Sequence, residues 1–207
     1  AEWYTKAAEH GNEYAQNSLG DCYYLGRGVE QDYEKAVEWY TKAAEEDNVD
    51  AQYMLGDCYY LGRGVEQDYE KAIEWYTEAA EQDNVDAQYM LGVCYYLGEG
   101  VEKNYQEAVR LFTAASDEGH VDSLNLLGDC YYNGNGVAQN YSKAVSLYEK
   151  ALSEGSSQAY YNLGSCYRWE FGVNKNKEKA KELFKKGIEL DNNSCKEAYE
   201  DMLKNND

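Results

Sequence analysis

The stretch Leu19–Ala36 reads LGDCYYLGRGVEQDYEKA, and the same residues return unchanged at Leu55–Ala72. Weaker copies begin at Leu91, Leu127 and Leu163, so successive copies lie 36 residues apart. A constant period of roughly 20–50 residues is typical of a repeat array in which each copy is one supersecondary unit. The sequence therefore predicts one continuous core built by stacking, and not a set of separate globular domains.

Each copy carries the signals of two helices, which the second copy shows clearly. Asn48 is a suitable N-cap for a first helix, helix A, over Ala51–Leu61, where apolar residues recur at helical spacing. A Gly-x-Gly turn then ends this helix. Asp68 can cap a second helix, helix B, from Tyr69 to about Gln82, which has a broad apolar stripe.

A glycine recurs in the middle of helix A, as Gly56 in the second copy. A glycine inside a helix costs about 1 kcal/mol relative to alanine, so its recurrence needs a reason. Ala72 and Ala79 are small residues on helix B. Small residues on both helices predict a close approach of the two helix axes, and hence an antiparallel hairpin.

The period divides the chain into seven predicted segments. Residues 1–11 are the second helix of a preceding repeat, residues 12–47, 48–83, 84–119, 120–155 and 156–191 are five full repeats, and residues 192–207 are a terminal capping helix. Because the chain starts inside a repeat, we expect it to be a piece of a longer protein. The last helix lacks the Leu-Gly pair of helix A, as a cap over the final apolar face would.

The pattern Leu55-Gly56-x-x-Tyr59 followed by Ala72-x-x-x-Tyr76 resembles the tetratricopeptide repeat, whose period is about 34 residues. The longer Gly-x-Gly-Val link and the absence of proline make the chain more similar to the Sel-one-like repeat (SLR) family. The resemblance covers essentially the whole chain. It implies an all-α, right-handed α-solenoid of antiparallel helical hairpins that serves as a non-catalytic adaptor for other proteins.

Charge and hydropathy exclude two classes of partner. The formal charge is −20, and binding to nucleic-acid phosphates needs clustered Lys and Arg, so we expect no nucleic-acid partner. No apolar run approaches the roughly 18 residues of a membrane span.

The cysteines occupy one recurring position of helix A, with one exception at Cys195. Equivalent positions on stacked helices lie roughly 8–10 Å apart, beyond the Cα separation of about 7 Å that a disulfide allows. The spacing predicts buried, unpaired thiols, which slightly favour a cytoplasmic location.

His10 and His120 fall between repeats, away from the thiols, so no catalytic pair is expected. The turns lack the spacing of a calcium or phosphate loop, and we expect neither an enzyme nor a bound metal or cofactor.

The resemblance places helix A on the concave side of the array, so its outward face is the candidate binding surface. That surface is predicted to present Asp21, Tyr24, Tyr53, Asp57, Tyr60, Tyr89, Tyr96, Asp129 and Tyr132. Two interpretations stay open: the tyrosines cover the core between repeats in a solvated groove, or they bind a partner. A Tyr/Asp groove suits a protein or peptide with basic and apolar side chains. The alternative is a glycan or small molecule, because tyrosine rings stack on sugars and aspartate accepts hydrogen bonds from hydroxyls.

Overall fold

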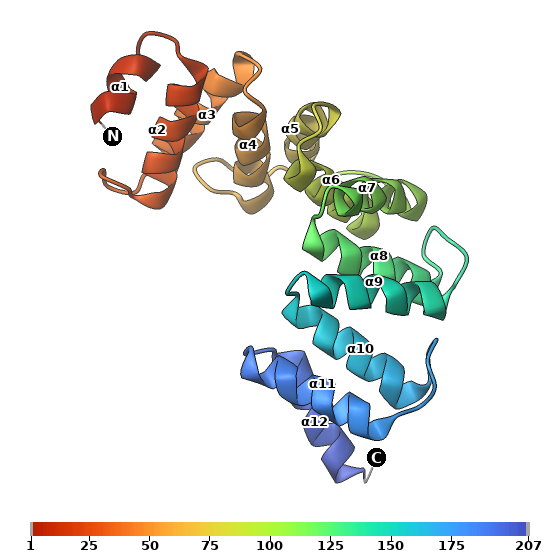
Figure 1. Cartoon of the computed structure of the whole chain (residues 1–207). Helices are drawn as coiled ribbons and strands as arrows, with labels where there is room; N and C mark the ends of the chain where they lie inside the picture. The colour runs from red at the N-terminus through yellow and green to blue at the C-terminus, as the bar shows by residue number, and fades with distance from the viewer. Residues whose placement is uncertain (1, 206–207) are drawn as a thin grey trace. The chain divides into compact units, whose positions relative to one another are not determined.

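The structure is a computed structural model that describes residues 2–205, and within that range it contains helices and no strand. Residues 1, 206 and 207, which fall in the first and last predicted segments, lie outside the described residues. The helices in chain order are α1 (Glu2–Ala8), α2 (Glu13–Leu25), α3 (Tyr33–Glu45), α4 (Val49–Leu61), α5 (Tyr69–Glu81), α6 (Val85–Leu97), α7 (Tyr105–Asp117), α8 (Val121–Asn133), α9 (Tyr141–Ser153), α10 (Ser157–Trp169), α11 (Lys177–Glu189) and α12 (Asn193–Lys204) (Figure 1).

The helices group into two compact units, residues 1–104 and residues 105–207. In the first unit, α2 with α3 and α4 with α5 form antiparallel hairpins, while α1 packs on α2, α3 on α4, and α5 on α6. In the second unit, the hairpins are α8 with α9 and α10 with α11, and α7, α9 and α11 pack on the helices that follow them. Each unit is thus a stack of helical hairpins, and the predicted all-α solenoid fold class is confirmed.

The predicted caps explain where the helices begin. The side chain of Asn48 accepts a hydrogen bond from the backbone N–H of Ala51 at 2.9 Å, and that of Asp68 from the N–H of Lys71 at 3.1 Å. Because Asn48 itself is the N-cap, α4 begins at Val49, two residues before the predicted start. These caps satisfy N–H groups that have no partner within the helix.

Left-handed residues end the helices as the sequence indicates. Gly62 follows α4 with φ 66°, and Asp83 stands between α5 and α6 with φ 60°. The equivalent turn position after α10 holds Glu170, which adopts φ 64° although it is not glycine. A left-handed residue turns the chain sharply after the last helical carbonyls, and this allows the next helix to fold back.

The close approach of helices A and B is confirmed, but alanines are not the residues that face Gly56. A Cβ atom added at Gly56 would lie 2.6 Å from Cδ1 of Tyr76, whose side chain is wholly buried. Ala72 and Ala79 are also buried in the core. The glycine therefore makes room for an aromatic ring of helix B.

The Gly-x-Gly turn, which joins helices A and B of one hairpin, also packs against the preceding hairpin. A Cβ atom added at Gly100 would lie 2.6 Å from the carbonyl group of Tyr69, the first residue of α5. Gly172 stands in the same relation to Tyr141 at the start of α9, with a distance of 2.5 Å to the carbonyl carbon. The second glycine of the turn is thus required by contact with the backbone of the preceding repeat, in addition to its positive φ.

Candidate functional site

The candidate site is the outward surface of the A helices, called here the helix A face. It is formed by α2, α4 and α6 in the first unit and by α8 and α10 in the second. The predicted residues on it are half-buried, so each of them both contacts the core and reaches solvent.

The three aspartates predicted for this face each accept a hydrogen bond from a buried tyrosine of helix B. The pairs, with the distance from the tyrosine hydroxyl to Oδ1, are Tyr40 with Asp21 (2.8 Å), Tyr76 with Asp57 (2.6 Å) and Tyr148 with Asp129 (2.6 Å). Burial raises the pKa of each carboxyl group, and the tyrosine hydrogen bond partly offsets that rise. One oxygen of each aspartate is therefore engaged by a buried hydroxyl, and the second oxygen is the one available to a ligand.

The repeats that lack one member of this pair also lack the other. Val93 and Phe112 occupy the two positions in the third repeat, and Ser165 and Phe184 occupy them in the fifth. Phenylalanine has no hydroxyl group, so it needs no acceptor across the hairpin. This matched change between copies is a signal in the sequence that the aspartates have a structural role, which their prediction as binding residues did not include.

The tyrosines near the end of helix A pack against the first tyrosine of helix B. The rings stand edge-on with centroids 5.2 Å apart in Tyr24 with Tyr33, Tyr60 with Tyr69, and Tyr132 with Tyr141. Edge-to-face geometry is favourable for aromatic pairs because of their ring quadrupoles. Burial raises the pKa of Tyr132 to about 12.

The middle residue of the next Gly-x-Gly turn reaches back to these tyrosine pairs. Arg63 donates a hydrogen bond to the hydroxyl of Tyr24, and its guanidinium lies 5.5 Å from that ring centroid. The Tyr60 hydroxyl donates to Oε2 of Glu99 at 2.6 Å, and the ring of Phe171 lies 5.3 Å from that of Tyr132. At this one repeat position, the cation of Arg63, the hydrogen-bond acceptor of Glu99 and the ring of Phe171 thus each contact the repeat before their own.

The remaining predicted tyrosines lie nearer the N-terminal half of the A helices or on α6. The ring of Tyr53 is 6.0 Å from that of Tyr76, and burial raises the pKa of Tyr53. Tyr89 and Tyr96 are half-buried on α6. The contacts of Tyr24, Tyr60 and Tyr132 support the interpretation that part of this face covers the core between repeats.

The helix A face of the second unit is hollowed at two adjoining places. The first hollow has a volume of about 300 Å³ and is lined by Asp129, Tyr132, Asn133, Tyr148, Gln158, Tyr161, Asn162 and Ser165. The second, also about 300 Å³, is lined by Tyr161, Ser165, Arg168, Trp169, Ser194, Glu197, Ala198 and Asp201. Tyr161 and Ser165 line both hollows, so the two form one surface that brings together the predicted Asp129 and Tyr132.

An ion pair between a buried guanidinium and an exposed carboxylate forms part of the second hollow. Arg168 is 5% exposed, and its guanidinium lies 2.7 Å from the Asp201 carboxylate, whose side chain is 54% exposed. The guanidinium also lies 4.5 Å from the ring centroid of Trp169. With Glu197 and Asp129, this surface holds three carboxylates against one guanidinium, and so it favours cations.

None of the residues that line the second hollow was among the predicted site residues. Tyr161 occupies the repeat position of Tyr53, so the repeat register could have found it. Arg168 and Trp169 stand where the first three copies have Tyr-Leu and the fourth has Tyr-Asn, a departure that marks the position without showing its partner. Asp201 lies 36 residues after Ser165, at the repeat position of Asp129, although its helix lacks the Leu-Gly pair of the other A helices.

The chemistry available here is hydrogen bonding, ring stacking and charge attraction. Among the described residues, no three His, Cys, Asp or Glu side chains gather as metal ligands would. Burial raises the pKa of the Cys130 and Cys166 thiols to about 12, so neither is an activated nucleophile. No helix in the described range is both long and apolar enough to cross a membrane.

The Sel1 repeat family matches residues 1–12, 13–48, 49–84, 85–120, 121–156 and 157–192. The chain belongs to the Sel1 repeat family. Proteins built from Sel1 repeats generally act as protein–protein interaction modules, and the fold is typically a non-catalytic scaffold.

Two solved Sel1-type structures resemble this chain closely. One is c5321, a protective antigen of uropathogenic Escherichia coli strains with an SLR fold, which is 33% identical with a TM-score of 0.90 over 97% of this chain and 43% of its own. The other is a Sel1 repeat protein from Oxalobacter formigenes, 34% identical with a TM-score of 0.80 over 87% of this chain and 74% of its own. The chain thus spans less than half the length of the Escherichia coli protein. A search of curated proteins gave no match.

Proposed function

We propose that this Sel1 repeat chain binds a protein or peptide on its helix A face, with the two adjoining hollows of the second unit as the main contact. The observation that carries the proposal is their shared wall, Tyr161 and Ser165, which makes one surface of two hollows. A surface with several neighbouring hollows suits an extended segment that places successive side chains in them.

The chemistry of these hollows selects the partner. Asp129, Glu197 and Asp201 supply negative charge, while Tyr161 and the half-exposed Trp169 supply aromatic surface. Aromatic side chains in such hollows often carry most of the binding energy, and complementary charge sets specificity and the association rate. We therefore infer a partner segment with Lys or Arg beside apolar side chains, held without any catalytic step.

Ser165→Arg tests the proposal with one change. The new side chain would enter both hollows and add a positive charge, so it should repel a basic ligand. Peptides selected from a random displayed library on the unaltered chain should be rich in Lys or Arg and aliphatic residues. They should bind Ser165→Arg at least about tenfold more weakly.

Ser142→Arg is the matched control, because it adds the same charge to an exposed position of α9. It should leave peptide affinity unchanged. If the selected peptides bound Ser165→Arg as well as the unaltered chain, the binding surface would lie elsewhere. A glycan ligand would instead show binding that hardly changes with salt, whereas an ionic peptide contact should weaken as salt rises.

Truncation of the predicted tyrosines tests binding less directly, because it also changes stability. Tyr60 packs on Tyr69 and donates to Glu99, so Tyr60→Ala would also loosen the contact between repeats. Tyr60→Ala with Tyr96→Ala is therefore expected to reduce binding and stability together. Trp169→Ala removes half-exposed aromatic surface of the second hollow and is the better truncation.

A further inference from the structure

A third hollow in the second unit lies among α7, α8 and α9 and shares no residue with the hollows of the helix A face. It has a volume of about 340 Å³. Its floor is the buried apolar side chains of Leu124, Leu127 and Leu147. Its rim includes the exposed side chains of Lys143 and Lys150 from α9, so the hollow opens to solvent between two cations.

The first two repeats carry a larger side chain at this place, whereas the third and fifth have leucine, Leu111 and Leu183, as the fourth does. The position of Leu147 is Trp39 in the first repeat and Trp75 in the second. Trp75 packs against the cluster that contains Leu55, and Leu55 has the repeat position of Leu127 in the floor. Leucine is smaller than tryptophan, so the hollow lies where an indole ring packs two repeats earlier.

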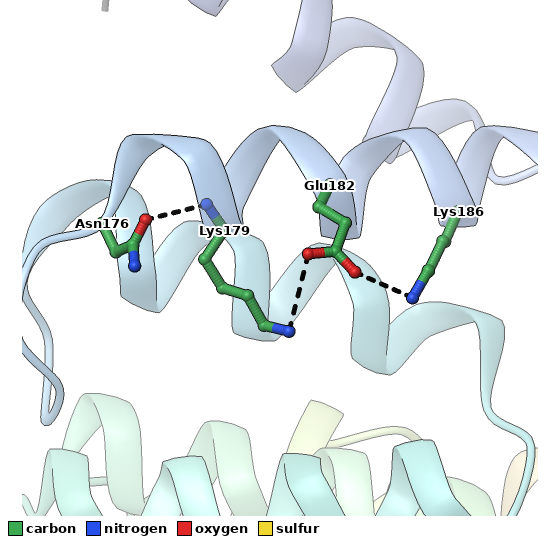
Figure 2. Close-up of polar contacts among 4 residues, drawn as sticks. All are labelled: Asn176, Lys179, Glu182 and Lys186. Atoms are coloured by element: carbon green, nitrogen blue, oxygen red, sulfur yellow. Dashed lines mark hydrogen bonds and ion pairs between the residues drawn. The ribbon is translucent and has the colours of Figure 1, made fainter.

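A carboxylate is missing at the rim as well. In the fifth repeat, Glu182 lies 3.8 Å from Nζ of Lys179 and 2.9 Å from Nζ of Lys186, and so bridges both lysines along α11 (Figure 2). The same figure shows Asn176, the N-cap, which accepts a hydrogen bond from the backbone N–H of Lys179. The bridge pairs each cation with a carboxylate at helical spacing.

In the fourth repeat the residue in place of Glu182 is Ser146, between the equivalent lysines Lys143 and Lys150. The Ser146 hydroxyl donates to the backbone oxygen of Ser142 at 3.1 Å, and Lys150 donates to the backbone oxygen of Ser116 at 3.4 Å. Neither contact neutralises a lysine. Among the described residues, Lys143 and Lys150 form no ion pair, including with Asp117, the carboxylate that also lines the hollow.

The fourth repeat thus lacks both members of a pair that the first two repeats carry, Glu38-Trp39 and Glu74-Trp75. We propose that a partner protein supplies them: an acidic segment docks here, inserts an aromatic side chain over Leu147, and places a neighbouring carboxylate between Lys143 and Lys150. The aromatic side chain provides most of the affinity, as anchors in hollows generally do. The two lysines select an acidic segment, which is opposite in charge to the ligand proposed for the helix A face.

The dipeptide acetyl-Glu-Trp-amide, titrated into the full chain and followed by NMR, tests the proposal. Its addition should shift resonances of α7, α8 and α9 and leave those of Tyr161 and Ser165 unchanged. Leu147→Trp restores the residue of the first two repeats, so the variant should melt at or above the original temperature. Because its own indole fills the hollow, it should bind the dipeptide at least about tenfold more weakly.

A second variant tests the charge separately. Ser146→Glu should bridge the lysines as Glu182 does, weaken dipeptide binding severalfold and remove its salt dependence. Ser146→Ala is the matched control and should bind as the original chain does. Acetyl-Gln-Trp-amide should bind more weakly than the acidic dipeptide, and a longer acidic peptide around Glu-Trp should bind more tightly.

Four results would overturn the proposal: no dipeptide binding to the original chain, undiminished binding to a folded Leu147→Trp, equal affinity for the Gln and Glu dipeptides, or indole-3-acetate binding more tightly than any peptide. The last result would assign the hollow to a small molecule. If Leu147→Trp failed to fold, undiminished dipeptide binding to Ser146→Glu would decide against the proposal.

Discussion

Asp129 shows at the scale of single residues that a side chain on a binding face can first serve the fold. Its carboxylate accepts a hydrogen bond from the hydroxyl of Tyr148, a residue that is almost fully buried. A buried hydroxyl without a partner costs about 1–3 kcal/mol. The two positions therefore change together between repeats, as Ser165 and Phe184 do in the fifth.

The coupling between Asp129 and Tyr148 can be measured directly. Asp129→Val should lower the free energy of unfolding by about 1–3 kcal/mol, because the Tyr148 hydroxyl then has no acceptor. Adding Tyr148→Phe should recover most of that loss, since the unpaired hydroxyl is removed. Denaturant unfolding of the original chain, both single variants and the double variant gives the coupling energy. Additive effects would show that the pair contributes nothing jointly.

Gly56 is a second residue whose role depends on one contact. Helix propensity alone predicts that Gly56→Ala stabilises the chain by about 1 kcal/mol. Because the new Cβ would lie 2.6 Å from the buried Tyr76 ring, we expect Gly56→Ala to destabilise by about 1–3 kcal/mol. Thermal or denaturant unfolding measures the change. In a Tyr76→Leu background the penalty should shrink, and a stabilised Gly56→Ala single variant would contradict the close contact.

At the scale of elements, the turn between helices A and B packs one hairpin against the hairpin before it. Gly172 and Gly155 both have positive φ, 72° and 91°, but their surroundings differ. A Cβ atom at Gly172 would lie 2.5 Å from the carbonyl carbon of Tyr141, whereas one at Gly155 would have no neighbour within 4 Å. The pair separates the effect of backbone conformation from that of packing between repeats.

Gly155→Ala should cost about 1 kcal/mol, because only the left-handed backbone conformation opposes a side chain there. Gly172→Ala should cost roughly 1–3 kcal/mol more, because the backbone of the preceding repeat must also move. Chemical denaturation of the two variants gives the comparison. Equal losses would mean that the turn does not hold successive repeats together.

The sequence alone could predict the helices and their caps, because both depend on residues close together in the chain. Asn48, Asp68 and the turn glycines are local signals, and the helix bounds follow them within two residues. The hollows could not be predicted in this way. The one beside Leu147 needs side chains from three helices, and the one beside Trp169 needs an ion pair between Arg168 and Asp201 of the final helix. Their positions follow from packing between elements, which the period does not encode.

At the scale of the whole molecule, the repeated interior position of helix A gives every repeat one buried thiol. All six cysteines are buried and unpaired, three in each compact unit. Burial raises the pKa of Cys58 and Cys94 in the first unit, and of Cys130 and Cys166 in the second, to about 12. In a stacked array each repeat is stabilised mainly by its neighbours, so thiol exposure reports the opening of the stack around it.

We therefore expect a thiol reagent to react with all six cysteines in denaturant without reductant, and very slowly in the native chain. The native rate should rise with pH, because the thiolate is the reacting form and its fraction grows as pH approaches the raised pKa. Mass spectrometry at intermediate denaturant should show the thiols of one unit becoming reactive together, since each unit is compact. Two or fewer reactive thiols in denaturant would show disulfides and an oxidised fold. A single thiol that reacts fast in the native chain would mean that its repeat opens independently of its neighbours.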